Sequence, residues 1–284
     1  MSIRVLITGA GSGFGRGIAF GLAQDSRYSI IATTQDYAQI FSLEQEAKKR
    51  GLKNIEFDKL NVTSPDDRSK VEGWDIDVLL NNAGISEGGS VLDIPAKAIN
   101  AQLQTNVIGP VALTQIVARK MVARKSGRII FMSSVAGLTV DPFSGAYSAS
   151  KHAVEAFAEA LYKETRPYNV DVLTINPGPF LTGFNDRMFE SHRNWGSDMP
   201  KPVFDYAKLS FPHEQYDPQI VIDKAIAIIK DENPMYRNVL PQSIIDDQQS
   251  QLADIWTRKA KDGAGATNEL VTKAEEIAPE TPVA

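Results

Sequence analysis

The stretch TGAGSGFG, residues 8–15, places spaced glycines directly after the apolar run RVLIT, residues 4–8. The run is typical of a buried strand, and residues 15–24 have the apolar spacing of a helix. Glycines let a backbone turn sharply and approach a pyrophosphate, and a helix N-terminus supplies free N–H groups for the anion. Because such a loop at a strand-to-helix junction is the context that supports this interpretation, we predict a dinucleotide-binding loop.

The same alternation of short β-branched runs and helical patterns continues along the chain. Helices are predicted at residues 15–24, 38–51, 99–125, 146–165 and 220–230. Strands are predicted at residues 4–8, 29–34, 54–62, 78–84, 127–134 and 170–178. Strands separated by helices imply a parallel sheet with right-handed crossovers, and six strands suit a doubly wound α/β sheet of the Rossmann type.

The domain organisation is predicted to be one α/β domain with appendages. Residues 1–242 form the dinucleotide-binding and catalytic domain, within which residues 184–216, rich in aromatics and prolines, form a segment that covers the substrate. Residues 243–284 are predicted to form a tail, with a surface helix followed by a loosely ordered end.

Composition excludes several classes of function. The 284 residues are 43% hydrophobic and 23% charged, carry a net charge of -5 and include no cysteine. The acidic balance argues against nucleic acid, and no apolar run reaches the roughly 18 residues of a membrane span. Disulfides and a cysteine nucleophile are excluded, and the three scattered histidines predict no metal site. Without a secretory leader pattern, the expected location is the cytoplasm.

The stretch YSASK, residues 147–151, pairs a phenol with an amine four residues apart. On a helix both side chains share one face. A free phenol has a pKa of about 10, so a nearby ammonium that favours the phenolate would make Tyr147 a better base at neutral pH. Tyr147 is therefore the candidate acid–base group, with Lys151 as the supporting charge. Ser134 or its neighbour Ser133, at a strand end, is a candidate hydrogen-bond donor to a substrate oxygen; alternation along a strand allows one of the two.

Together these motifs resemble the short-chain dehydrogenase/reductase family. The shared features are TGxxxGxG at the first loop, NNAG at residues 81–84, Asn106 in QTNVIGP, Ser134 in FMSSVAG, YSASK, and PGPFLT at residues 177–182. They occur in the family's order, and the resemblance covers residues 8–182. It implies an NAD(P)-dependent oxidoreductase that interconverts a secondary alcohol and its ketone or aldehyde.

The resemblance also implies residue roles. It selects Ser134 over Ser133, makes Asn106 the holder of a water that links Lys151 to solvent, and gives Lys151 a bond with the nicotinamide ribose. Thr182 would bond the nicotinamide carboxamide. The implied catalytic set is Asn106, Ser134, Tyr147 and Lys151. The implied cofactor-binding set is Gly9, Gly13, Phe14, Gly15, Thr34, Gln35, Asn61, Val62, Asn82, Ala83, Gly84, Tyr147, Lys151, Pro177, Gly178 and Thr182.

The residues that choose between NAD and NADP depart from the usual patterns. The second predicted strand ends in Thr34, Gln35 and Asp36, where an acidic residue commonly binds a ribose 2′-hydroxyl or a basic one a 2′-phosphate. Asp36 would repel a 2′-phosphate, so the segment favours NAD. Asn61 stands where the family commonly has Asp, and residues 63–77 are short, which predicts a trimmed helix there.

Two other classes of function share parts of this pattern. A non-catalytic dinucleotide sensor could use the same fold, although the complete set of Ser134, Tyr147 and Lys151 argues for turnover. Nucleotide-sugar epimerases or dehydratases also pair a Tyr with a Lys, but they have a different glycine pattern and a larger C-terminal domain.

The expected partners are a small-molecule alcohol or carbonyl and further copies of this chain. Phe143, Phe180, Leu181, Phe184 and Met188 form a candidate apolar wall for the substrate, with ordinary core packing as the alternative. The apolar residues 104–122 and 154–161 predict a homodimer or homotetramer, as the family commonly pairs these helices between subunits.

Overall fold

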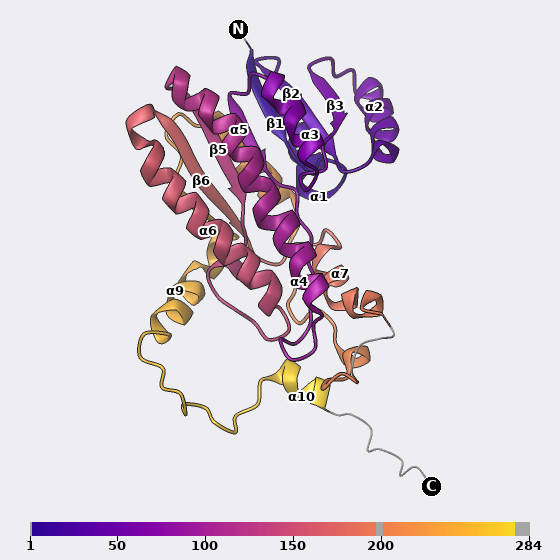
Figure 1. The fold of residues 1–284 in the computed structure, drawn as a ribbon, viewed down its shortest axis with the longest axis vertical. Helices are drawn as coiled ribbons and strands as arrows, with labels where there is room; N and C mark the ends of the chain where they lie inside the picture. Colours follow the sequence, from indigo (N-terminus) through magenta and orange to yellow (C-terminus); the bar gives the residue numbers. More distant parts are fainter. Residues whose placement is uncertain (1, 197–200, 276–284) are drawn as a thin grey trace.

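The computed structural model describes residues 2–196 and 201–275. One parallel sheet lies between layers of helices (Figure 1). Its strands are β1 (Ile3–Ile7), β2 (Tyr28–Thr34), β3 (Ile55–Lys59), β4 (Val78–Asn81), β5 (Gly127–Met132), β6 (Val170–Pro177) and β7 (Arg237–Leu240). The helices are α1 (Gly13–Leu22), α2 (Ile40–Lys49), α3 (Pro65–Ser69), α4 (Ala96–Leu103), α5 (Gly109–Arg124), α6 (Gly145–Thr165), α7 (Phe184–Glu190), α8 (Gln219–Lys230), α9 (Ile245–Asp254) and α10 (Glu269–Glu275).

The strand order is β3-β2-β1-β4-β5-β6-β7, and every pairing is parallel. The chain runs outward from β1 to β3, then returns to place β4 on the other side of β1. This reversal between β1 and β4 is the switch point at which open α/β sheets bind ligands, beyond the carboxyl ends of the strands. The predicted doubly wound α/β sheet is confirmed, and the first glycine loop lies at its switch point.

Neighbouring residues of one strand face two different cores. In β1, Val5 and Ile7 belong to the core under α1 and α8, whereas Leu6 belongs to the core under α5 and α6. Because side chains alternate along a strand, apolar residues on both faces are needed when helices cover both sides. This explains why the strands read as nearly continuous apolar runs in the sequence.

The structure corrects the predicted set of elements in three places. A seventh strand, β7, joins the edge of the sheet beside β6. Its four residues are too few to show the apolar pattern from which strands are predicted. The helix after the glycine loop begins at Gly13, two positions earlier than predicted. The predicted helix 99–125 is two helices, α4 and α5, joined by a π-helical turn at Gln104–Ile108. The trimmed helix between β3 and β4 is confirmed as the five-residue α3.

The segment predicted to cover the substrate packs at the carboxyl end of the sheet, apart from residues 197–200, which lie outside the described residues. Its buried Met188, Trp195 and Tyr206 form a third core with residues of α4 and α10. α10 returns from the tail to this core, where Ala274 is fully buried and its carbonyl accepts a hydrogen bond from Asp205 N at 3.0 Å. The sequence did not predict this contact; residues 276–284 of the predicted tail lie outside the described residues.

We expect Leu79→Ala to lower the free energy of unfolding by about 2–5 kcal/mol, because Leu79 is fully buried on β4 and its removal leaves a cavity. Chemical denaturation measures the loss. Leu92→Ala is the matched control, since Leu92 is 73% exposed and its change should cost less than about 0.5 kcal/mol. Equal losses in both variants would contradict the placement of β4 at the centre of the sheet.

Candidate active site

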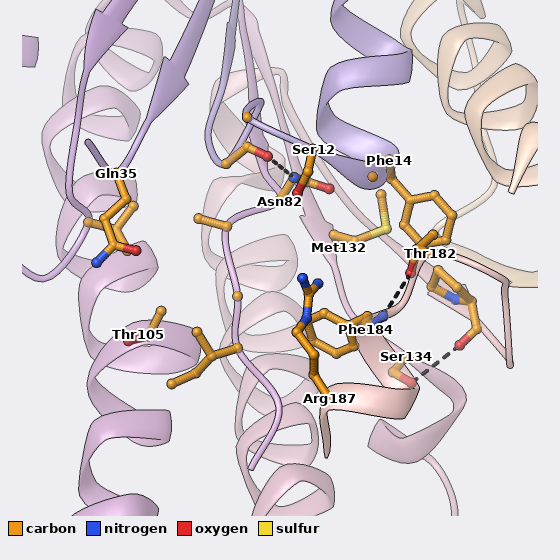
Figure 2. A pocket seen from close by; sticks show the side chains of 18 of the residues that line it. Ser12, Phe14, Gln35, Asn82, Thr105, Met132, Ser134, Thr182, Phe184 and Arg187 are labelled. Atoms are coloured by element: carbon orange, nitrogen blue, oxygen red, sulfur yellow. Dashed lines mark hydrogen bonds between the residues drawn. The ribbon is translucent and has the colours of Figure 1, made fainter. Parts of the chain in front are cut away.

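A cavity of about 380 Å³ opens beyond the carboxyl ends of the central strands. This volume lies in the range of small-molecule sites. Figure 2 shows Gln35 at one end, Ser12 and Asn82 in the middle, and Thr182 and Ser134 at the other end. Among the described residues that line it none is acidic, while Lys151 and Arg187 bring positive charge, so the cavity suits an anionic ligand.

Two glycines of the first loop are required by close approach of the backbone. A Cβ on Gly9 would lie 2.7 Å from Cα of Ala83, and φ of Gly9 is +68°. A Cβ on Gly15 would lie 2.4 Å from the carbonyl oxygen of Gly9. The loop therefore folds tightly against the NNAG turn, and Gly13 and Phe14 open α1 on the cavity wall.

Hydrogen bonds tie this loop to the end of β4. Thr8 Oγ1 accepts from the backbone N–H groups of Asn82 and Ala83, each at 3.0 Å. The Asn82 side chain donates from Nδ2 to the carbonyl oxygens of Thr8 at 2.9 Å and Gly9 at 3.1 Å. The Ser12 hydroxyl makes no capping bond, so α1 begins at the cavity wall without a side-chain cap. The geometry fits an anionic group such as a pyrophosphate.

At the Gln35 end of the cavity, Thr34 and Gln35, which were predicted to contact the part of the cofactor that distinguishes NAD from NADP, differ in position. Gln35 is exposed and lines the cavity. Thr34 is 1% exposed and donates from Oγ1 to the carbonyl of Asp36 at 2.8 Å, so its side chain is not on the cavity wall. Gln39, which the sequence did not single out, joins Gln35 there.

The fold brings the cation of Lys59 to this end of the cavity. Lys59 lies beside Thr34 in the register of β3 with β2, but its Nζ donates to Asp67 at 2.7 Å. Asp67 also accepts from the backbone N–H of Asn61 at 2.8 Å. Arg16 pairs with Glu46 and is not on the cavity wall.

The Tyr147, Lys151 and Ser134 groups meet where α6 passes the end of β5. The buried Lys151 donates from Nζ to the carbonyl of Met132 at 2.8 Å and lies 5.7 Å from the centre of the Tyr147 ring. Removal of water raises the pKa of Tyr147 to about 12, and the Ser134 side chain opposes this rise. The direction is opposite to the lowering that was expected from the charge of Lys151, because burial outweighs it. Burial lowers the pKa of Lys151 to about 8, against the opposing charge of Glu155.

Ser133 and Ser134 both contribute to the cavity wall, just beyond the end of β5 at Met132. That only one of the two hydroxyls can face a substrate oxygen stays a prediction. Ser134 begins a short 3-10 turn, accepts from Ala136 N at 3.1 Å and donates to the Pro177 carbonyl at 3.2 Å. The buried Ser133 hydroxyl has no hydrogen-bond partner among the described residues.

Asn106 lies behind the site, inside the π-helical turn. Its side chain accepts from Ile85 N at 2.8 Å and donates to the Ile85 carbonyl at 2.9 Å and to Ser150 Oγ at 3.0 Å. The amide therefore clamps the segment after the NNAG turn onto α6. The water-holding role implied by the resemblance stays a prediction.

The predicted lid, residues 184–196 and 201–216 of the described chain, supplies the remaining wall of the cavity. Figure 2 shows Phe184 and Arg187 projecting into it from α7, with Thr182 close by. The Phe184 ring packs edge-on against Tyr147, with centroids 5.8 Å apart. No residue of the described chain forms an ion pair with Arg187, so its charge is available to a ligand.

Most of the predicted site residues line this one cavity. They are Gly9, Gly13, Phe14, Gln35, Asn61, Val62, Asn82, Ala83, Gly84, Ser134, Tyr147, Lys151, Pro177, Gly178 and Thr182. Gly15, Thr34 and Asn106 are not on its wall. Lining residues without a predicted role include Gly11, Ser12, Gln39, Thr63, Ile85, Thr105, Met132, Asn185 and Arg187. Gly11 and Ser12 lie within the glycine loop, so the sequence could have indicated them as lining residues. No pattern in the sequence indicated Arg187.

The predicted apolar wall divides between cavity and core. Phe184 and Phe180 line the cavity. Phe143 and Met188 are buried in the core beneath the lid, as the packing alternative requires. Leu181 is 64% exposed.

Two further findings concern metals and membranes. Within residues 2–196 and 201–275, no cluster of three or more His, Asp or Glu side chains is arranged to hold a metal ion. In the same part of the chain, every helix is too short or too polar to cross a membrane.

Comparison with known proteins assigns the family. The family described as short chain dehydrogenase matches residues 4–193. Dehydrogenase/reductase SDR family member 7B of Xenopus laevis is 35% identical over 193 residues, which are 64% of this chain and 59% of that protein. Retinol dehydrogenase 8 of Bos taurus is 33% identical over 192 residues, 66% of this chain and 62% of that protein. The match thus spans less than two thirds of either relative.

Solved structures share the fold. A short-chain dehydrogenase/reductase from Burkholderia phymatum in complex with NAD has a TM-score of 0.75 at 22% identity, covering 91% of this chain and 96% of that one. A short-chain dehydrogenase from Sphingobium yanoikuyae in complex with NADPH has a TM-score of 0.70 at 22% identity, covering 91% and 97%.

The sheet and its switch-point cavity define a dinucleotide-binding α/β protein of the Rossmann class. Within that class, the chain belongs to the short-chain dehydrogenase/reductase family of oxidoreductases.

We expect Gly15→Ala to lower the free energy of unfolding by at least about 1 kcal/mol, because the new Cβ would meet the Gly9 carbonyl oxygen and Asn82 Nδ2, each at 2.4 Å. The clash costs more than the gain of about 0.5–1 kcal/mol that alanine brings to a helix, so the net change is destabilising. Thermal or chemical denaturation measures it. Gly73→Ala is the control, since no atom lies within 4 Å of its added Cβ. A stabilised Gly15 variant would show that the loop does not fold tightly against Asn82.

Proposed function

We propose that the protein is an NAD(P)-dependent oxidoreductase that interconverts an alcohol and its ketone or aldehyde. One observation carries the proposal: Tyr147, Ser134 and Lys151 lie together in the same cavity as the glycine loop. A dinucleotide that extends from Gln35 past Ser12 to Thr182 would bring its nicotinamide to the acid–base groups. When bound, it supplies or accepts the hydride.

Tyr147 would transfer the proton that accompanies the hydride. With its pKa raised to about 12, the phenol keeps its proton at neutral pH and can donate it to a carbonyl oxygen. The carbonyl carbon gains a hydride, the oxygen gains the Tyr147 proton, and an alcohol results. In the reverse direction the phenolate accepts the hydroxyl proton.

Lys151 and Ser134 would assist this transfer in different ways. With a pKa of about 8, Lys151 is mostly protonated at pH 7, and its charge lowers the cost of the phenolate that forms when Tyr147 gives up its proton. The Ser134 hydroxyl, which donates to the Pro177 carbonyl in this structure, would turn to donate to the substrate oxygen as negative charge develops. The complete set favours turnover over a purely dinucleotide-sensing role.

An apolar alcohol or carbonyl is the proposed substrate class. Phe184 packs against Tyr147, and no acidic residue of the described chain lines the cavity. The name of the relative retinol dehydrogenase 8 points in the same direction, since retinol is an apolar alcohol. A cytoplasmic location and a homodimer or homotetramer remain proposals; Phe157 of α6, 45% exposed, supports an interface on that helix.

Tyr147→Phe tests the proposed chemistry. We expect kcat/KM for carbonyl reduction to fall by about 10²–10⁴-fold, because the ring still packs but carries no proton, while the dissociation constant for NADH changes little. A panel of apolar ketones and alcohols, followed by NADH absorbance and fluorescence, provides both readouts. Tyr168→Phe, at a surface position 41% exposed, is the control. Near wild-type turnover in the Tyr147 variant would remove Tyr147 as the acid–base group.

The cofactor preference follows from the charges beside Gln35. We expect the wild type to favour NAD, because Asp36 faces solvent there and the nearby Lys59 is paired with Asp67. The double variant Gln35→Arg, Asp36→Ser should shift the ratio of kcat/KM toward NADP, since a guanidinium can bond a phosphate bidentately.

Gln251→Arg with Asp247→Ser is the matched control for that variant, because it makes the same charge change at a hydrogen-bonded Gln–Asp pair on α9. It should leave the cofactor ratio unchanged. A wild type that prefers NADP tenfold, equivalent to about 1.4 kcal/mol, would overturn the assignment to NAD.

A further inference from the structure

A buried carboxylate, Glu155, lies one helical turn beyond Lys151 on α6 and is 7% exposed. Both of its oxygens are used: Oε1 accepts from Asn176 Nδ2 at 2.6 Å, and Oε2 accepts from Arg237 at 2.9 Å. Burying a carboxylate is costly unless it is paired and hydrogen-bonded, and apolar residues often replace such groups without loss of stability. This cost indicates that Glu155 has a role beyond packing.

The first link runs from Glu155 to the backbone of Ser134. Asn176, fully buried on β6, donates from Nδ2 to Glu155 and also to the Ser134 carbonyl oxygen at 3.2 Å. The other side of its amide is held by Thr174, whose Oγ1 donates to Asn176 Oδ1 at 2.9 Å. The Ser134 main chain is thus held through Asn176 by a carboxylate that lies outside the cavity wall.

The second link runs from Glu155 to Lys151. Residues four apart on a helix share a face, and Glu155 is the charged group that acts on Lys151, raising its pKa against the effect of burial. The other groups around the pair are Tyr147 on α6, the Met132 carbonyl of β5, and Arg237 and Tyr236 at the start of β7. Among the described residues, Arg237 is the cation paired with Glu155.

We propose that Glu155 is a positioning residue of the acid–base site, which holds the Ser134 backbone through Asn176 and supplies the negative charge that keeps Lys151 protonated. The inference rests on the proposed function for its effect on turnover. Its effect on Lys151 is a property of the folded chain and can be measured without a substrate.

The sign of the effect is defined by the charges. Loss of the Glu155 charge lowers the pKa of Lys151, so the ammonium is lost at a lower pH. The alkaline decline of kcat/KM for reduction then begins at a lower pH in Glu155→Gln than in wild type, while rates near pH 6 differ less. Glu155→Asp keeps the charge and should restore the wild-type pH profile.

The direct test is NMR titration of protein labelled with ¹³C at lysine Cε, with the Lys151 signal identified by its loss in Lys151→Arg. Glu155→Gln should move the Lys151 titration down by about half a pH unit or more. Glu159→Gln is the matched control: it removes one carboxylate from the same helix, but Glu159 is half-exposed and pairs with Lys163. That control should move the titration much less.

Arg237→Gln should shift the Lys151 titration in the opposite direction. It therefore tests the inference even if the Glu155 variant does not fold. The Arg237 side chain is 39% exposed, and its loss removes a cation from Glu155, so the Lys151 titration should move up. A Lys151 titration that is the same in wild type, Glu155→Gln and Arg237→Gln overturns the inference, whatever the loss of stability. If the wild type shows no turnover with any cofactor or substrate, the proposed function is overturned. The NMR titration still tests the role of Glu155 in that case, because it needs no substrate.

Discussion

The close approach of two backbone turns across the switch point organises the whole site. Gly9 passes so near Ala83 that a Cβ has no room, and Thr8 and Asn82 join the two turns by hydrogen bonds. Because β1 and β4 are neighbours in the sheet, these bonds set the position of α1 relative to the end of β4. The open N-terminus of α1, the cavity wall and the path of a bound dinucleotide all depend on this contact.

The acid–base groups depend on a second constraint, which is burial balanced by charge. Removal of water raises the pKa of Tyr147 and lowers that of Lys151, and both shifts favour the neutral side chains. The Ser134 hydroxyl opposes the first shift and Glu155 the second. The site thus combines burial, which favours the neutral forms, with polar groups that oppose both shifts.

The lid links the active site to the distant C-terminal part of the chain. α7 carries Phe184 and Arg187 into the cavity, while on its buried side Met188 packs in the core that includes Tyr206, Leu270 and Ala274. The position of Phe184 and Arg187 therefore depends in part on α10, which reaches this core after a long connection from α9 (Figure 1). The sequence analysis did not predict this dependence, because α7 and α10 are far apart in the chain.

Local sequence by itself determined the sheet class, the glycine loop and the spacing of Tyr147 and Lys151, because these depend on side-chain period and on backbone freedom within a few residues. It could not reveal β7, whose four residues are a strand only because β6 offers its edge. Nor could it place Arg187 in the cavity, pair Lys59 with Asp67, or turn Thr34 away from the cavity wall. Tertiary structure decided these points, since contacts between residues far apart in the chain set which charges are neutralised and which side chains remain available to a ligand.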